Sequence, residues 1–266
     1  MKQRSTLVFS CMAFGYAFLY APILSLIIFS FNESRLVTVW GGFSTKWYGA
    51  LLENDQLLGA AWISLRIAFI NACFAVLLGT LAAVALVRFG RFRGRKLLAF
   101  MVGAPLVMPE VILGLASLLL FVSMDQLLGW PEGRGMTTIA IAHITFSTAY
   151  VAVVVQSRLG RLDPSLEEAA MDLGARPLKV FFVITLPLIA PALTAGWLLA
   201  FTLSLDDLVI ASFTSGPGAS TLPMVVYSSV RLGVSPEINA LATLLVLIVS
   251  VGIIIAGMLI QQKKPT

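Results

Sequence analysis

Long apolar blocks divide the chain, and this pattern restricts it to very few folds. The six blocks cover residues 7–31, 60–87, 97–123, 136–157, 184–205 and 240–261. Each is near or above the roughly 20 residues that a helix needs to cross the hydrocarbon core of a bilayer. Within that core every backbone polar group must be satisfied inside the segment, which favours helices. The sequence therefore predicts an all-α integral membrane protein with six transmembrane helices, and residues 1–266 form a single domain.

The composition agrees with a membrane protein, because only 12% of the residues are charged and the mean hydropathy is +0.95. The first block follows Lys2 and Arg4 and resembles the start of a signal peptide. Its run of about 25 residues is too long for a typical signal-peptide core, and no clear small-x-small cleavage site follows. We therefore expect an uncleaved first helix. Cys11 and Cys73 fall inside apolar blocks, where they behave as small hydrophobic residues and predict neither a disulfide nor a metal site.

The net charge of +5 is a topology signal rather than an indication of nucleic-acid binding. Thirteen of the 18 basic residues fall at the two ends of the chain and in the loops after the second and fourth blocks: Lys2, Arg4, Arg88, Arg91, Arg93, Arg95, Lys96, Arg158, Arg161, Arg176, Lys179, Lys263 and Lys264. Cytoplasmic loops carry the excess of Lys and Arg in membrane proteins. Both termini are therefore expected in the cytoplasm.

Prolines interrupt three of the blocks: Pro22, Pro105, Pro109, Pro187 and Pro191. A proline in a membrane helix leaves backbone carbonyls that neighbouring helices or water must satisfy. Each proline is consistent with a simple kink or with a broken helix that lines a path. The third block is the strongest candidate for a broken helix.

A short acid-rich segment at 163–177 lies between the fourth and fifth blocks. Asp163 followed by Pro164 is a helix start signal, and Gly174 is a stop signal. Between them an apolar stripe recurs at helical spacing: Leu166, Ala169, Ala170 and Leu173. A helix of about ten residues is marginal alone in water, so it needs a partner surface. A helix resting on lipid would carry bulkier residues on its apolar face.

The same segment carries a family signature. Glu168-Ala169-Ala170, three residues, Gly174, nine residues, Ile184, one residue and Leu186-Pro187 resemble the EAA signature of permease subunits of bacterial ABC importers. The resemblance implies a type I importer permease fold, in which this helix docks into a groove on a cytoplasmic ATPase. Its alanines would let the helix backbone approach that partner closely.

Further stretches look like the polyamine permeases, among them "VRFGRFRGR", "APLVMPEVILG" and "FTLSLDDLVIASF", and the insertion "GWPEGRGM" is more similar to the putrescine branch. This resemblance implies a location in the bacterial inner membrane and a cargo such as putrescine or spermidine. The implied partners are a homologous second permease subunit, two ATP-binding subunits that carry ATP and magnesium, and a periplasmic binding protein. It implies no cofactor of the chain's own and no nucleic-acid partner.

Ionisable residues inside a span are functional candidates, because they are costly there. Glu110 lies thirteen residues into the third block, and Asp206 and Asp207 close the fifth block just after Ser204. By resemblance to the polyamine permeases these residues, together with Trp47, are candidates for a cation path. The alternatives are that Glu110 pairs with Arg66 or bonds His143, and that the two aspartates cap a following helix. His143 itself is expected to form a core hydrogen bond rather than relay protons.

Two other classes of protein fit the sequence less well. A self-sufficient, ion-coupled secondary transporter would use Glu110 and His143, but it leaves the 163–177 helix unexplained and no paired broken repeats are evident. An intramembrane enzyme lacks parts, because neither H-E-x-x-H nor G-x-S-x-G is present. A phosphate loop of the form G-x-x-x-x-G-K-[ST] is also missing, so we expect no catalytic residues here. An importer subunit for another small solute stays open.

Overall fold

The computed structural model describes residues 2–36, 39–232 and 236–262, with side chains described for 8–36, 39–231 and 236–251. Lys263 and Lys264, which entered the charge count, lie outside the described residues. The described part of the chain is helical, and its β-structure consists of one isolated bridge between Asn32 and Phe43. Two compact units are distinguished, one formed by residues 1–58 and 226–266 and the other by residues 59–225.

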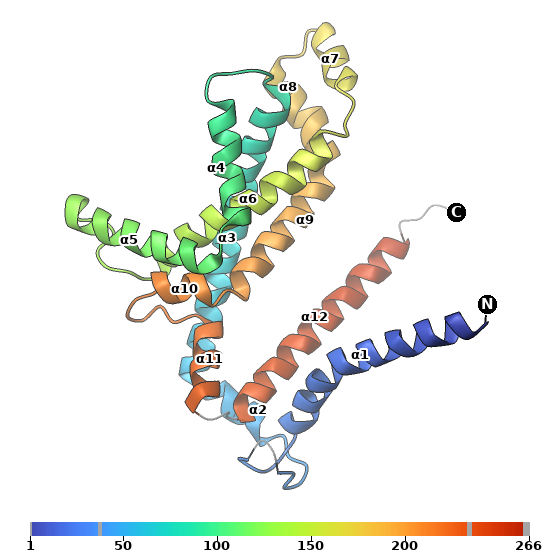
Figure 1. The fold of residues 1–266 in the computed structure, drawn as a ribbon, viewed down its shortest axis with the longest axis vertical. Coiled ribbons are helices and arrows are strands. Elements are labelled where there is room, and N and C mark those ends of the chain that lie inside the picture. Colours follow the sequence, from blue (N-terminus) through green and yellow to red (C-terminus); the bar gives the residue numbers. More distant parts are fainter. Residues whose placement is uncertain (1, 37–38, 233–235, 263–266) are drawn as a thin grey trace. The chain divides into compact units, whose positions relative to one another are not determined.

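The first unit contains α1 (Lys2–Ser30), α2 (Lys46–Leu52) and α12 (Pro236–Gln262), and α12 packs against both of the others (Figure 1). The connection after α1 is organised by Asn32, whose side chain is almost fully buried. Its amide group donates to the carbonyl of Val39 (2.7 Å), and its side-chain oxygen accepts from the backbone N–H of Gly41 (2.8 Å). A single buried asparagine thus closes the loop into a compact turn.

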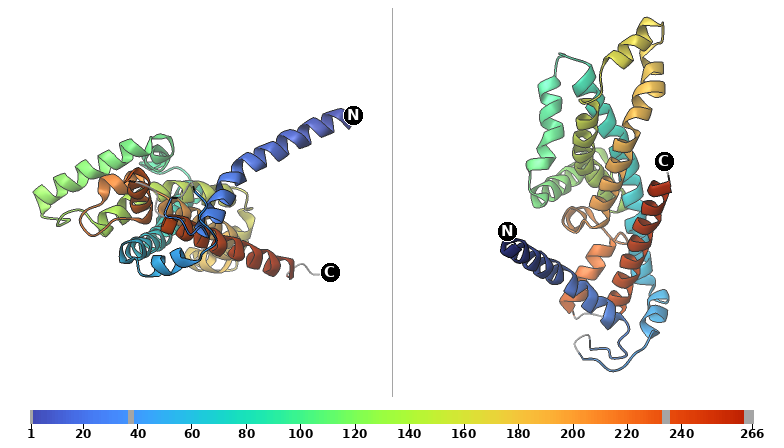
Figure 2. Two further views of the ribbon diagram at one scale, coloured as in Figure 1. Left: turned by 90° about the horizontal axis from the view of Figure 1, so that it is seen from below. Right: turned by 90° about the vertical axis from the view of Figure 1, so that its right-hand side faces the viewer.

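The second unit holds most of α3 (Asp55–Arg88) and the chain from there to the start of α11 (Leu222–Leu232). Its helices are, in order, α4 (Arg95–Val107), α5 (Glu110–Leu128), α6 (Met136–Leu159), α7 (Ser165–Asp172), α8 (Pro177–Val180), the π-turn η1 (Phe181–Thr185), α9 (Leu186–Leu205) and α10 (Val209–Thr214). Figure 2 shows α3, α4, α6 and α9 grouped together from two further directions.

The core of this unit lies where α3, α6 and α9 meet, and small residues bring the three backbones close together. A Cβ atom added to Gly79 of α3 would stand 2.9 Å from Val151 of α6, and one added to Gly196 of α9 would stand 3.2 Å from the same valine. Membrane helices associate through such close packing, because lipid tails are as apolar as the side chains they would replace. Glycines on two helices therefore form the slot that Val151 fills.

The six-span, all-helical membrane fold predicted from the sequence is confirmed. Five helical segments are long and apolar enough to cross a bilayer: Val8–Ser30, Asp55–Arg88, Glu110–Leu128, Met136–Leu159 and Pro177–Leu205. The sixth is a shorter apolar stretch, Pro236–Val251, within the longer helix α12. The described helices extend beyond the apolar blocks at several ends, because polar first and last turns continue the helix outside the apolar run.

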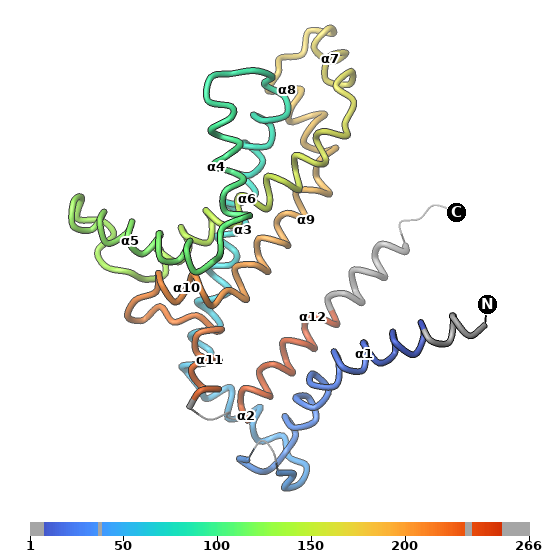
Figure 3. The backbone as a smooth tube through the Cα atoms, viewed as in Figure 1, coloured from blue at the N-terminus to red at the C-terminus, as the bar shows by residue number. Residues whose placement is uncertain are grey.

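The third block, which the sequence marked as the strongest candidate for a broken helix, breaks into α4 and α5 (Figure 3). Met108 adopts an extended conformation (φ −78°, ψ 136°), and α5 begins two residues later. A residue before proline is driven out of the helical region, and Pro109 has no N–H to continue the ladder. Pro105, by contrast, is accommodated inside α4. Glu110 is therefore the first residue of a new helix.

Prolines also shape the path into the fifth span. Pro177 opens α8 at its first turn, where the missing N–H costs nothing. Pro187 has no N–H to offer the carbonyl of Val183 four residues earlier. The backbone widens into a π-turn at this point, from Phe181 to Thr185, before continuing as α9. Such turns commonly mark functional positions in helices.

Candidate functional site

Helix α7 forms within the segment where the sequence predicts a docking helix, although it has eight residues rather than ten. The side chain of Asp163 accepts a hydrogen bond from the backbone N–H of Ser165 (3.0 Å), and this bond holds the pKa of Asp163 below its usual value. At the other end Gly174 takes the left-handed conformation (φ +86°). The N–H groups of Gly174 and Ala175 bond back to the carbonyls of Met171 and Ala170, which is a Schellman stop.

The apolar stripe of α7 is open to the surroundings, since none of its residues is buried. Glu168 and Ala169 are exposed, and Ala170 is half-buried. Leu166 is 49% exposed, and Leu173, just after the helix, is 90% exposed. Large apolar side chains exposed together with small ones commonly mark an interaction surface. The helix stands at one end of its unit beside α8 (Figure 1), and none of its residues is buried.

Glu167 lies in the first turn of α7, and the motifs in the sequence give it no role of its own. Its carboxylate forms an ion pair with the guanidinium of Arg88, in the last turn of α3 (Nε to Oε2, 2.9 Å). It also accepts a hydrogen bond from the hydroxyl of Thr185, the last residue of the π-turn (2.9 Å). The two charged side chains are 17% and 18% exposed. Only the spatial neighbours of Glu167 reveal this role, because the sequence places them 79 and 18 residues away.

A buried polar cluster joins α6, α9 and the start of α10. His143 is 2% exposed, and its ring nitrogens lie 2.7 Å from the Ser204 hydroxyl and 3.1 Å from Asp207 Oδ2. The Asp207 carboxylate also accepts the backbone N–H groups of Ile210 (3.3 Å) and Ala211 (2.8 Å). A carboxylate only accepts hydrogen bonds, so Nε2 of His143 carries a proton in this arrangement. The expected core hydrogen bond of His143 is present, and Asp207 caps a short helix.

The two remaining acids are placed differently from Asp207, because both Glu110 and Asp206 are exposed. Glu110 lies at the helix break, and Asp206 is the residue that ends α9. Within the described residues, the ion pairs and the hydrogen bonds of His143 involve partners other than Glu110. The structure thus brings together Ser204, Asp207 and His143, and leaves Glu110 and Asp206 exposed.

Trp47 belongs to the first unit and is a core residue there. It is 7% exposed, and its ring N–H donates to the backbone carbonyl of Asn32 (2.6 Å). The ammonium group of Lys46 lies 4.9 Å from the ring centroid, over one face. A cation of the chain itself therefore lies over one face of the Trp47 ring.

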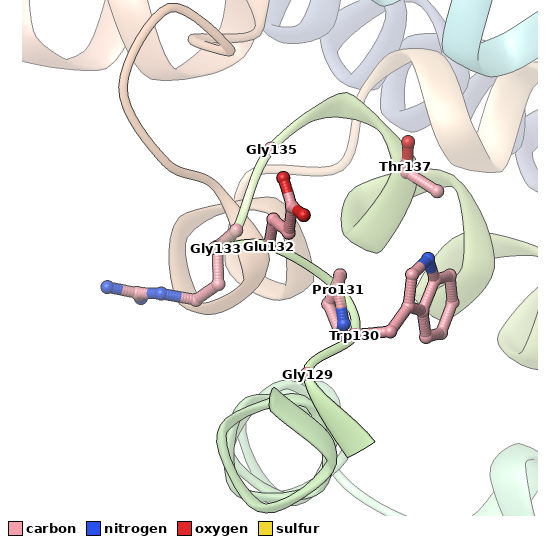
Figure 4. A pocket seen from close by; sticks show the side chains of 8 residues that line it. Gly129, Trp130, Pro131, Glu132, Gly133, Gly135 and Thr137 are labelled. Carbon is pink, nitrogen blue, oxygen red and sulfur yellow. The ribbon is translucent and has the colours of Figure 1, made fainter. Parts of the chain in front are cut away.

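Two surface hollows lie outside these clusters. The first, about 370 Å³, is formed by residues 129–135 and Thr137 in the connection between α5 and α6 (Figure 4). The Arg134 guanidinium links this connection to α10 by donating a hydrogen bond to the backbone carbonyl of Phe213 (3.1 Å). The second, about 410 Å³, is lined by Trp62, Leu65, Arg66, Phe69, Ile70 and Phe201. Arg66 is exposed beside aromatic side chains, and no described ion pair joins it to Glu110.

These features define a class of protein. The described chain combines several membrane-length helices, a helix broken at an exposed acid, and the exposed helix α7 tied to α3 and the π-turn, and these features fit a transport component of a membrane. The chain belongs to the family of binding-protein-dependent transport system inner membrane components, whose model matches residues 75–262. It is accordingly a multi-pass membrane subunit of a transport system, without catalytic chemistry of its own.

Curated relatives and solved structures agree with this family. The chain is 68% identical to the putrescine transport system permease protein PotI of Escherichia coli (strain K12), over 87% of this chain and 82% of that protein. It is 46% identical to the spermidine/putrescine transport system permease protein PotC of the same organism, over 94% and 91%. A crystal structure of a bacterial ABC transporter for alginate matches with a TM-score of 0.68 at 19% identity, over 99% and 97% of the two chains, and shows the shared fold.

Proposed function

We propose that the chain is the permease subunit of an ATP-driven importer of a polyamine and forms half of the path for a cargo such as putrescine or spermidine. The 68% identity to a putrescine permease supports the cargo class. The observation that carries the mechanism is α7, an exposed helix with a small-residue apolar face and a carboxylate that ties it to α3 and the π-turn. Such a helix transmits force only if something outside the chain moves it.

The proposed partners follow from that requirement. A homologous second permease would complete the path, two ATP-binding subunits would hold ATP and magnesium, and a periplasmic protein would deliver the cargo. One ATPase would seat α7 through Leu166, Glu168, Ala169, Ala170 and Leu173, with Gly174 ending the helix. The excess of Lys and Arg in the loops beside α7 supports a cytoplasmic location for this helix and for both termini of the chain.

The proposed path for the cation uses acids at two levels. Glu110, at the break between α4 and α5, and Asp206, at the end of α9, have exposed carboxylates that can meet an ammonium group. Staged carboxylates lower the penalty for a charge in a low-dielectric region, provided that neither holds the cargo too tightly. Asp207 and Ser204 support this path indirectly. Both bond the His143 ring, and Asp207 also holds the start of α10. Trp47 supports the outer connection after α1 rather than the cargo.

Uptake into vesicles that contain the complete complex tests the proposal. Labelled putrescine, spermidine and a neutral solute of similar length are compared, with and without ATP. We expect ATP-dependent uptake of the amines and none of the neutral solute. Equal uptake of the neutral solute would refute the cation path and favour an importer for another small solute. Uptake that persists without ATP would instead favour an ion-coupled transporter.

A further inference from the structure

The docking helix is joined to the rest of its unit by one charged side chain. Within the described chain, Glu167 is the α7 residue whose side chain forms a hydrogen bond or ion pair with another helix. The other acids of this helix, Glu168 and Asp172, are exposed. None of the apolar side chains of α7 is buried, so packing holds it only weakly. The position of α7 therefore depends strongly on the contacts of this one carboxylate.

Those contacts join two spans at their cytoplasmic ends. Arg88 is the last residue of α3, and Thr185 is the last residue of the π-turn that leads into α9. Thr185 is 4% exposed, so its hydroxyl has few partners other than the Glu167 carboxylate. An ionised carboxylate that accepts from a guanidinium and a hydroxyl forms stronger bonds than neutral groups do. The Glu167 carboxylate thus bonds the end of α3 and the π-turn that leads into α9. The apolar faces of α3 and α9 share one core with α6.

A second hydrogen bond extends the connection to the broken helix. The Arg95 guanidinium, at the start of α4, donates to the carbonyl of Leu86 in the last turn of α3 (2.9 Å). The end of α3 is thus held by Arg88 on the side of α7 and by Arg95 on the side of α4. Helix α4 leads directly to the break at Met108 and Pro109, where Glu110 is exposed. A continuous set of contacts therefore runs from α7 through the end of α3 to α4, the helix that ends beside Glu110.

We infer that Glu167 is a positioning residue of the docking helix: its carboxylate, held by Arg88 and Thr185, fixes α7 to the ends of α3 and α9, so that a displacement of α7 moves these spans with it. The inference rests on the proposed function, because it presumes that an ATPase displaces α7. It differs from that function in assigning the transmission of movement to Glu167, whose side chain faces the chain itself. Glu168, on the neighbouring face, is the acid that an ATPase can reach.

The test measures substrate uptake per ATP hydrolysed in vesicles that contain the complete complex. Glu167→Gln keeps the size of the side chain and removes its charge. We expect the uptake-to-hydrolysis ratio to fall at least about fivefold, the low end of typical coupling between sites, while the ATPase still co-purifies.

Variants of Arg88 test the partner of this carboxylate. Arg88→Gln should give the same loss of the ratio, and the double variant should lose no more than either single variant. Arg88→Lys, which keeps the positive charge, should retain most of the ratio. Asp172→Asn is the matched control, because this acid lies on the same helix, is exposed, and forms no described ion pair or side-chain hydrogen bond with another helix.

A distance measurement separates positioning from general damage. Spin labels at Lys96 on α4 and Met171 on α7, which is 42% exposed and lies outside the proposed docking residues, should give a broader distance distribution in Glu167→Gln but not in Asp172→Asn, in a background without Cys11 and Cys73. If the glutamine variant does not assemble, Glu167→Asp, which keeps the charge on a shorter side chain, should show an intermediate loss.

Three outcomes would overturn the inference. They are a wild-type ratio in Glu167→Gln, full additivity of the two single variants, and loss of the ATPase with an unchanged distance distribution. Failure of the proposed function looks different, because Glu168→Lys would then keep both the ATPase and uptake.

Discussion

The same substitution at two neighbouring aspartates should change the stability of the protein to different extents. Asp207 is nearly buried, and its two oxygens accept hydrogen bonds from two backbone N–H groups of α10 and lie against the His143 ring. Asp206 is exposed. We expect Asp207→Asn to destabilise the protein and Asp206→Asn to leave its stability almost unchanged, although both changes replace a carboxylate by an amide.

The magnitude follows from the hydrogen bonds. An asparagine has one acceptor oxygen, so whichever way its amide is turned, its NH₂ group faces a backbone N–H of Ile210 or Ala211. A buried donor left without an acceptor costs about 1–3 kcal/mol. For a chain of about this size, each kcal/mol lowers the midpoint of thermal unfolding by about 2–4 °C. We therefore expect Asp207→Asn to lower the midpoint by about 2–12 °C.

Thermal unfolding of the purified protein in mild detergent, followed by tryptophan fluorescence, measures this difference. Ser204→Ala removes the hydroxyl on the other ring nitrogen of His143 and should give a smaller loss in the same direction. A midpoint that falls as far in Asp206→Asn as in Asp207→Asn would refute the reasoning. In uptake assays both variants should transport less, Asp206→Asn through the lost charge at the path and Asp207→Asn through the displaced start of α10.

The other predictions concern transport and topology. Glu110→Gln should lower uptake of putrescine-like cations at least tenfold, equivalent to about 1.4 kcal/mol of barrier, with assembly unchanged; wild-type uptake would mean that this acid is structural. Glu168→Lys should abolish both uptake and co-purification of the ATPase while the protein stays inserted, and normal values of both would remove the docking role of α7. A reporter after Thr266 should read as cytoplasmic and one within 32–58 as periplasmic, and the opposite result at either site would require a different count of spans.

The membrane-spanning architecture could be predicted from the sequence because it depends on local properties. The length of an apolar run and the need to satisfy backbone groups within it do not depend on distant residues. The stop at Gly174 is also local, since only the backbone conformation at that position matters. The break before Glu110 was one of two readings of Pro109, because a proline in a membrane helix can be tolerated when neighbours satisfy the freed carbonyls. Pro105 is tolerated inside α4, and Pro109 is not.

The roles of neighbouring acids were decided only by the tertiary structure. Glu167 and Glu168 are the same residue type in the same turn, as are Asp206 and Asp207 at the end of α9, and no local rule separates them. Successive residues of a helix point about 100° apart, so Glu167 can face the chain while Glu168 faces outward. Asp206 and Asp207 lie in the short non-helical link between α9 and α10, where Asp207 bonds His143 and the start of α10 while Asp206 is exposed. Which one does so depends on Arg88, Thr185 and His143, which lie between 18 and 79 residues away in sequence. Packing brings these partners together, and a carboxylate beside a guanidinium or an imidazole then becomes part of the framework instead of the surface.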